Sequence, residues 1–282
     1  MKNWIAALTM LPFSCLQAQT QINSFDDVQY WVGSGQNRAV VVLQWNDGLN
    51  PASVAWGYRW DGAATGLDML RAIAGSTIVT DPAGDPVSAG SGADERLRLG
   101  LVQYSFGLSI LSLEYATPGA PTRTQSDWFS GYWEYLIRGG NFEYYDWNTQ
   151  SMALYSVPGS NSYSASWTSA PIGAGDRPLI DGAWDAYSFA PGFATVAVKA
   201  PIAAPLPVPV ASCSLNQQGR PVVSALSKTG FSYRLEYSDS LPGSWKPMGQ
   251  SELGTGGLLV FVDETVARPP QRFYRIAVTQ TP

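Results

Sequence analysis

Aromatic and arginine side chains recur at positions where they could bind a ligand. The chain has 11 tryptophans, 14 tyrosines and 10 phenylalanines. Their flat faces can stack on a sugar ring or a macrocycle, and the planar fork of arginine pairs with anionic groups. We predict a ligand-binding surface drawn from Arg59, Trp60, Asp61, Trp133, Arg177 and Trp184. The alternative is that the tryptophans, with Trp45 and Trp56, fill the core between sheets.

Oxygen-bearing side chains in or beside glycine-containing turns could hold a divalent cation. Carboxylate and amide oxygens are the ligands that Ca²⁺ prefers, and the set here is Asn46, Asp47, Asp61, Asp181 and Asp185. No run matches an EF-hand, and aspartate beside glycine is commonly a turn residue. We therefore predict no cofactor, with Ca²⁺ as the cation to expect if these turns bind one.

Catalysis has little support in the sequence. The chain has no histidine, which removes the commonest general base, the commonest zinc ligand and every Ser-His or Cys-His device. Four acidic residues near aromatic ones could supply the paired carboxylates of a glycosidase: Glu134, Glu143, Asp146 and Asp185. Their spacing along the chain does not set their separation in space. We predict a non-enzymatic protein, with a glycan-active enzyme as an alternative.

The first residues predict a secretory signal peptide over 1–18. A single positive charge at Lys2 precedes an apolar run that ends at Leu16, and Ala18 is a small residue suited to cleavage. Cys15 leaves a lipoprotein alternative open. We predict export to an extracellular, periplasmic or cell-surface location. No later apolar run is long enough to span a bilayer, so we expect no integral membrane segment after cleavage.

The composition favours a mostly β protein with a low content of charged residues. Charged residues make up 14%, and the 28 glycines and 20 prolines demand many turns. The net charge of −5 comes without a basic cluster. We therefore do not expect nucleic acid as a partner. The partner that we expect is a small molecule or a glycan.

Hydrophobic patterns place the elements of the first part of the chain. We expect a hairpin over 30–43 around a loop at 33–37, with Val40–Leu43 buried on both faces. A strand over 54–60 should put Trp60 toward the core and Arg59 on the opposite face, nearer solvent. Thr65 should cap a short helix over 66–74 that stops at Gly75. Two further stretches, 81–94 and 117–127, have loop compositions.

A proline-rich stretch over 200–211 predicts a linker between two domains. It separates an aromatic-rich β domain over 19–199, with one short helix, from a small β-sandwich over 212–282. The second part resembles fibronectin type III and immunoglobulin-like modules in its strand at 233–238, its Trp245 and its segment 272–275. Such modules usually act as spacers or adhesion units, so the resemblance implies no catalytic role.

The first domain carries motifs that resemble a family of uncharacterised secreted or surface bacterial proteins. They are WGYRWDG at 56–62, the Thr-Gly pair at 65–66 and DGAWD at 181–185, within residues 28–190. Some relatives are associated with cofactor uptake. The resemblance therefore implies a ligand-binding role, with a corrinoid as one candidate. Glycan binding and a structural or adhesive role at the cell surface are the alternatives.

Overall fold

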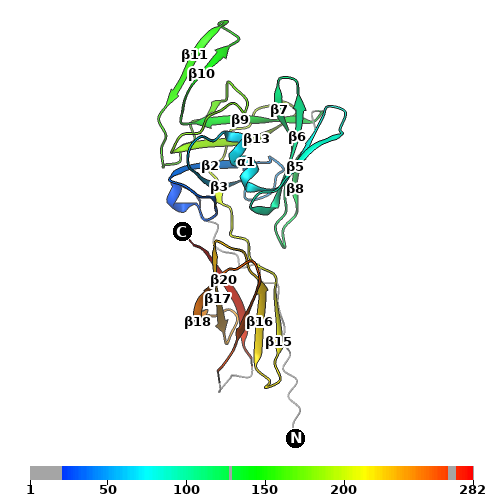
Figure 1. Cartoon of the computed structure of the whole chain (residues 1–282), viewed down its shortest axis with the longest axis vertical. Helices are drawn as coiled ribbons and strands as arrows, with labels where there is room; N and C mark the ends of the chain where they lie inside the picture. Colours follow the sequence, from blue (N-terminus) through cyan, green and yellow to red (C-terminus); the bar gives the residue numbers. More distant parts are fainter. Residues whose placement is uncertain (1–20, 127–128, 266–270, 282) are drawn as a thin grey trace. The chain divides into compact units, whose positions relative to one another are not determined.

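The structure of the protein is a computed structural model that describes residues 21–126, 129–265 and 271–281. Within these ranges the fold is mostly β, with one α-helix, as the composition predicts. The chain divides between Pro205 and Leu206 into two compact units (Figure 1). The predicted signal peptide lies outside the described residues.

The first unit is built on a large central sheet. In the described part of the chain this sheet has seven strands in the order β1-β3-β2-β13-β9-β12, with β14 also paired to β3. The strands are β1 (Trp31–Gly33), β2 (Asn37–Gln44), β3 (Ser53–Trp60), β9 (Gly131–Arg138), β12 (Thr168–Ser169), β13 (Ala183–Pro191) and β14 (Ile202–Ala203). Residues 40–43 of β2 are fully buried, so the prediction of a strand covered on both faces is confirmed.

The predicted hairpin over 30–43 is wrong. β1 pairs with β3 in parallel, and β2 pairs with β3 antiparallel. Trp31 lies opposite Gly57, where an added Cβ would stand only 2.3 Å from the indole Cε3 atom. The space left by the missing side chain of Gly57 thus receives the Trp31 ring, and this long-range fit places β1 beside β3.

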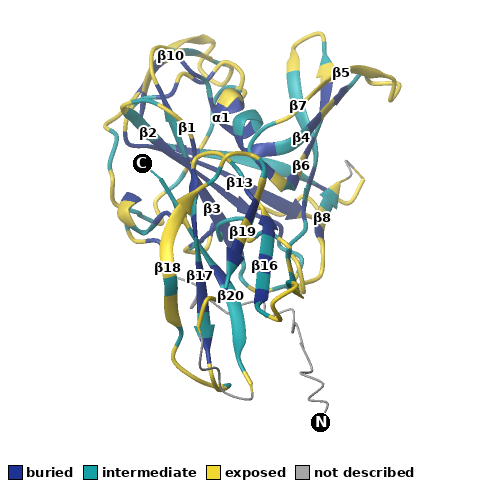
Figure 2. Cartoon of the chain, turned by 60° about the horizontal axis from the view of Figure 1, so that its bottom comes forward, coloured by how far each residue is buried: buried dark blue, intermediate teal, exposed yellow. Residues whose placement is uncertain are grey.

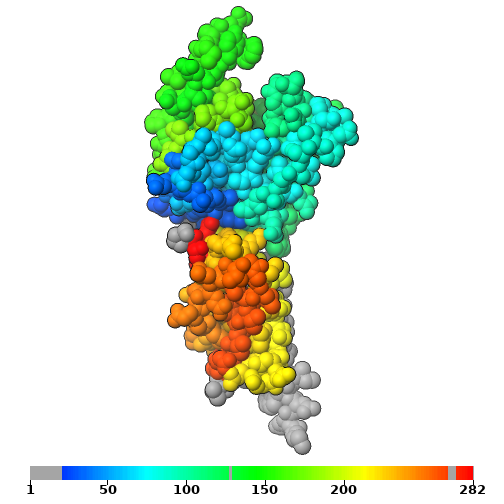
Figure 3. Space-filling model, viewed as in Figure 1, coloured from blue at the N-terminus to red at the C-terminus, as the bar shows by residue number. Residues whose placement is uncertain are grey.

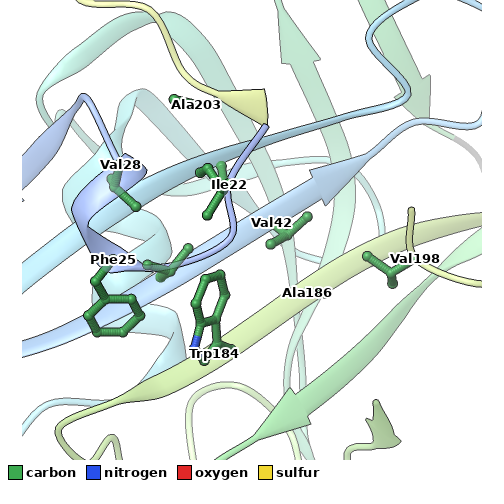
Figure 4. Close-up of a cluster of buried hydrophobic side chains, with 10 residues drawn as sticks. Ile22, Phe25, Val28, Val42, Trp184, Ala186, Val198 and Ala203 are labelled. Carbon is green, nitrogen blue, oxygen red and sulfur yellow. The ribbon is translucent and has the colours of Figure 1, made fainter. Parts of the chain in front are cut away.

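Each face of the central sheet has its own core. One face is covered by the N-terminal segment with the 3-10 helix η1 (Phe25–Asp27). There Ile22, Phe25 and Val42 pack around Trp184 (Figure 4). The opposite face carries Trp56 and Trp60, and Trp60 is only 5% exposed. The strand over 54–60 therefore presents its tryptophans to the core, as predicted.

Helix α1 (Gly66–Ile73) begins where the sequence predicts. The Thr65 hydroxyl accepts a hydrogen bond from the Asp68 amide, and the Asp68 carboxylate accepts one from the Thr65 amide, which satisfies two amides of the first turn. The predicted stop at Gly75 is wrong. Ala74 is already extended and begins β4 (Ala74–Thr80) without a loop, so the helix ends by entering a second sheet.

The second sheet of this unit pairs its strands in the order β5-β4-β6-β7-β8. The remaining members are β5 (Pro86–Gly90), β6 (Asp94–Tyr104), β7 (Gly107–Tyr115) and β8 (Arg123–Ser126). β5 and β8 lie in the stretches 81–94 and 117–127, so the prediction that these are loops is wrong in part. Both are edge strands, and the open edges of β4 and β7 supply the backbone partners that local composition does not reveal.

Two tryptophans join the two sheets. The Trp45 indole donates to the carbonyl of Leu113 at 2.9 Å, and the Trp56 indole donates to Asp94 Oδ2 at 2.9 Å. Both rings contact Tyr115 of β7. Their polar atoms are satisfied, so these buried aromatics serve packing.

A two-stranded hairpin leaves the end of β9. It consists of β10 (Gly140–Asp146) and β11 (Ser151–Val157), which pair only with each other among the described strands. We call it the arm. Figure 3 shows it as a green ridge that protrudes from the first unit.

The second unit has two sheets, as expected for a β-sandwich. Among its described residues the strand orders are β15-β16-β19 and β18-β17-β20. The strands are β15 (Ala211–Leu215), β16 (Pro221–Leu226), β17 (Phe231–Ser238), β18 (Lys246–Leu253), β19 (Leu258–Val262) and β20 (Phe273–Gln280). Figure 2 shows β18 as largely exposed. The predicted linker over 200–211 contains β14 near one end and the first residue of β15 at the other.

Candidate functional site

Two of the three tryptophans proposed as ligand contacts, Trp60 and Trp184, lie in the protein core. The Trp184 side chain has 0% exposure, and its indole donates to the Ser160 carbonyl at 2.7 Å. Trp60 stacks on Tyr58 with ring centroids 5.5 Å apart. Trp133 is partly exposed, but its indole donates to the Gln125 carbonyl. The buried rings of Trp60 and Trp184 stabilise the fold and present no free face to a ligand, which corrects their predicted role.

Arg177 and Asp185 form a buried ion pair. Both side chains have 0% exposure, and Arg177 Nε lies 3.0 Å from Asp185 Oδ1 without the alignment of a hydrogen bond. Tyr135 donates to the other carboxylate oxygen at 2.6 Å. Burial raises the pKa of the Asp185 carboxyl, while Arg177 and the Tyr135 hydrogen bond oppose the rise. Burial also raises the pKa of Tyr135 well above its usual value, so the phenol keeps its proton and donates.

This ion pair joins segments that are distant in the sequence. Arg177 Nη2 donates to the Gly139 carbonyl at 2.6 Å, and the Arg177 carbonyl accepts from the Gly66 amide at the start of α1. A Cβ on Gly66 would lie 2.6 Å from Asp185 Oδ2. The close packing on Gly66 and the full burial leave no room for a ligand. Arg177 is thus a structural residue here, contrary to its predicted role in ligand binding.

The predicted cation ligands do not form one site. Asp47 is paired with Arg123 through both carboxylate oxygens, and the Asn46 amide donates to the Phe189 carbonyl. Asp61 accepts from the Gln36 backbone amide and Asp181 from that of Arg38, while Asp185 is paired with Arg177. No group of three or more acidic, histidine or cysteine side chains in the described ranges could hold a metal. These oxygens serve turns and ion pairs, so the five candidate residues do not combine into the Ca²⁺ site considered from the sequence.

The four acidic residues considered as a catalytic pair are also separated. Asp185 is opposite Ile137 in the register between β13 and β9, so Glu134 points to the other face of the sheet. Glu143 and Asp146 lie on opposite faces of the arm. Burial raises the pKa of Glu134, but no second carboxylate of this set faces it across the sheet. The strand register therefore places Glu134 and Asp185 on opposite faces of the central sheet, and Glu143 and Asp146 on opposite faces of the arm, so neither of these two pairs has the arrangement that a glycosidase needs.

One face of the arm is exposed and rich in apolar side chains. Tyr145 lies directly opposite Met152, and Leu154 is in the next row of the same face, opposite Glu143. Met152 and Leu154 are exposed. Trp147, at the turn between the strands, is 81% exposed and meets Tyr145 edge-on with centroids 4.8 Å apart. We call this surface the arm face.

The opposite side of the arm packs on the central sheet. Phe142 and Tyr155 stack at 5.1 Å and are both buried against Ile137 of β9. A two-stranded hairpin is marginal by itself, so these contacts hold the arm in place. They also fix which side is presented outward.

Arg59 is the predicted ligand residue whose position best suits a ligand. It is partly exposed and lies on the face of β3 opposite Trp60, as predicted. Its guanidinium carbon is 5.0 Å from the centroid of the Trp31 ring. Asp61 follows in an exposed turn and is held by the Gln36 amide.

The sequence did not single out the arm face as a binding surface. Residues 142–147 are rich in aromatic side chains, and their sequence does not decide which of these are exposed. A usable signal was present, because Trp147 directly precedes the turn-forming residues 148–150, and turn positions lie at the surface. The composition of the strands by itself does not distinguish Tyr145 from Phe142.

Comparison of the chain with protein-family models, with curated proteins and with solved structures finds no match. No described helix is long and apolar enough to cross a membrane.

Proposed function

We propose that this is an exported, non-enzymatic binding protein that uses the arm face to bind a glycan chain. The observation that carries the proposal is the outward display of Trp147 and Tyr145 together with Met152 and Leu154. Soluble proteins seldom expose a contiguous apolar surface unless it binds something. The exposed apolar side chains are not needed to hold the arm on the sheet, because Phe142 and Tyr155 on its buried side already do so.

Polar groups on the same face favour a glycan. Asn141 lies opposite Ser156, and Glu143 is in the following row. Amide, hydroxyl and carboxylate groups can exchange hydrogen bonds with sugar hydroxyls, while aromatic rings cover the apolar side of a pyranose. The arm thus combines both kinds of contact that a sugar chain requires.

The shape of the arm favours an extended ligand over a small cofactor. Small cofactors are usually enclosed in concave sites that bury most of their surface, whereas the arm is a protruding ridge (Figure 3). A long ligand can lie along such a ridge and contact several residues in series. This argument places glycan binding ahead of corrinoid capture.

Affinity gel electrophoresis tests the proposal with soluble neutral polysaccharides, namely xylan, mixed-linkage β-glucan, galactomannan and amylose. We expect at least one of them to retard the wild-type protein, and Trp147→Ala to weaken that retardation about tenfold or more, as for a central aromatic contact. The fold should persist, because Trp147 is exposed.

Phe106→Ala is the matched control. Phe106 is 79% exposed and stacks on Tyr104 at the turn between β6 and β7, so the change removes a similar exposed aromatic outside the arm. We expect its binding to equal that of the wild type. Equal losses in the two variants, or no retardation by any of the four polysaccharides, would contradict the assignment.

A further inference from the structure

Two arginines face each other on neighbouring strands. Arg38 of β2 is the direct antiparallel partner of Arg59 of β3. Side chains in this relation start from Cβ atoms about 4.5–5.5 Å apart on one face, and like charges placed there repel each other. Both residues are partly buried, which weakens the screening of this repulsion by water.

No carboxylate oxygen in the described ranges lies within 4.0 Å of a guanidinium nitrogen of either arginine. Two acidic residues lie at this end of the sheet, but they bind backbone. Asp181 Oδ1 accepts from the Arg38 amide at 2.8 Å, and Asp61 Oδ1 accepts from the Gln36 amide at 3.0 Å. The two guanidinium groups are therefore not neutralised by the acids beside them.

Several other arginines of the first unit have a carboxylate partner. Arg96, Arg123 and Arg177 each contact a carboxylate, at 2.7, 2.6 and 3.0 Å. Arg71 and Arg138 have no carboxylate partner within the described part of the chain, but neither lies opposite another arginine, since Arg71 is on α1 and Arg138 is the strand partner of Trp184. Arg38 and Arg59 differ because two uncompensated charges are placed side by side.

Aromatic rings position this pair. The Arg59 guanidinium carbon lies 5.0 Å from the Trp31 ring centroid. That of Arg38 lies 6.0 Å from Trp31 and 5.4 Å from Phe25. Trp31 is itself held over Gly57, and its indole donates to the Val28 carbonyl at 3.1 Å. Cation–π contacts orient a guanidinium but leave its charge in place.

We propose that Arg38, Arg59 and Trp31 form a binding site for an oxyanion, that is, the sulfate, phosphate or carboxylate group of a small ligand. Each guanidinium can donate two parallel hydrogen bonds to such a group, and the bound negative charge would relieve the repulsion between the arginines. The site shares no residue with the arm face. It is a second site beyond the proposed glycan-binding function and does not depend on it.

Isothermal titration calorimetry of the full chain tests the site with sodium sulfate, sodium phosphate and sodium glucuronate. Ionic strength is held constant with sodium chloride. We expect the wild-type protein to bind at least one of these anions, and the strongest one identifies the preferred group. Arg38→Gln and Arg59→Gln should each weaken that binding about tenfold or more, the effect of losing charged hydrogen bonds.

Three further variants make the test specific. Arg71→Gln removes one isolated positive charge and should bind as the wild type does. Trp147→Ala alters only the arm face and should also bind normally, so failure of the glycan proposal leaves this result unchanged. If a glutamine variant does not fold, Arg59→Lys keeps the charge without the planar fork and should still weaken binding.

The proposal is overturned if none of the three anions binds the wild-type protein. It is equally overturned if Arg38→Gln and Arg59→Gln, or the lysine variant, bind as tightly as the wild type. A loss in Arg71→Gln equal to the loss in the paired variants would also overturn it, because net charge would then explain the binding.

Discussion

At the scale of single residues, the buried Arg177–Asp185 pair should be important for stability. Asp185→Asn keeps the side-chain volume but leaves the fully buried Arg177 without a counter-charge. We expect a loss of about 3–5 kcal/mol in the free energy of unfolding, as for other broken buried pairs, measured by urea denaturation. Asp61→Asn, in an exposed turn, should change stability by less than about 0.5 kcal/mol. Equal small effects would show that Asp185 is dispensable.

A second residue-scale prediction concerns acid unfolding of the second unit. Burial opposes ionisation of Asp263, but hydrogen bonds from Thr265, Tyr274 and Arg272 outweigh it and lower the pKa from 3.8 to about 2. Because the folded pKa lies below the unfolded one, this stabilisation is present above about pH 4 and is lost as the pH falls through about 2. The shift corresponds to about 2 kcal/mol.

Near-UV circular dichroism of the full chain during acid titration measures this effect. Asp263→Asn should lower stability at neutral pH and flatten its dependence on pH between about 4 and 2. Asp239→Asn is the control, since Asp239 also binds Arg272 but is 41% exposed, and solvent screens it. An unchanged pH dependence in Asp263→Asn would refute the assignment.

At the scale of elements, the arm should behave as a locally stable hairpin. Phe142 and Tyr155 anchor it on β9, while Tyr145 on the opposite side makes no contribution to that core. Phe142→Ala should therefore speed proteolytic cleavage within 140–157 more than it lowers the global melting temperature, because the arm can open by itself. Tyr145→Ala should leave cleavage near the wild-type rate. Equal cleavage rates in the two variants would mean that residues other than Phe142 hold the arm on the sheet.

At the scale of the whole molecule, the two units should unfold separately. Each has its own buried residues, and the chain crosses between them near Pro205 and Leu206. We expect differential scanning calorimetry of the full chain to resolve two transitions, and limited proteolysis to release a fragment that begins near residue 206. If the wild-type protein shows a single transition, and Asp185→Asn lowers the temperature of that whole transition, the two units unfold as one cooperative unit.

Several features could be predicted from the sequence because they depend on neighbouring residues. The start of α1 follows from Thr65 and Asp68, which satisfy each other's backbone amides within one turn. The burial of β2 follows from four consecutive apolar residues, and the two sheets of the second unit follow from alternating strands. The opposite orientation of Arg59 and Trp60 follows from the two-residue period of a strand.

Other features were decided only by tertiary structure, because they depend on partners far away in the chain. β5 and β8 form where open sheet edges offer hydrogen bonds, and β1 joins β3 because Gly57 leaves room for Trp31. Burial of Phe142 and exposure of Tyr145 cannot be told from two aromatic residues in the same stretch, because the segments that pack against one side of the strand decide it. The pairing of Arg38 with Arg59 likewise arises from strand register, which brings together two charges that are 21 positions apart in the sequence.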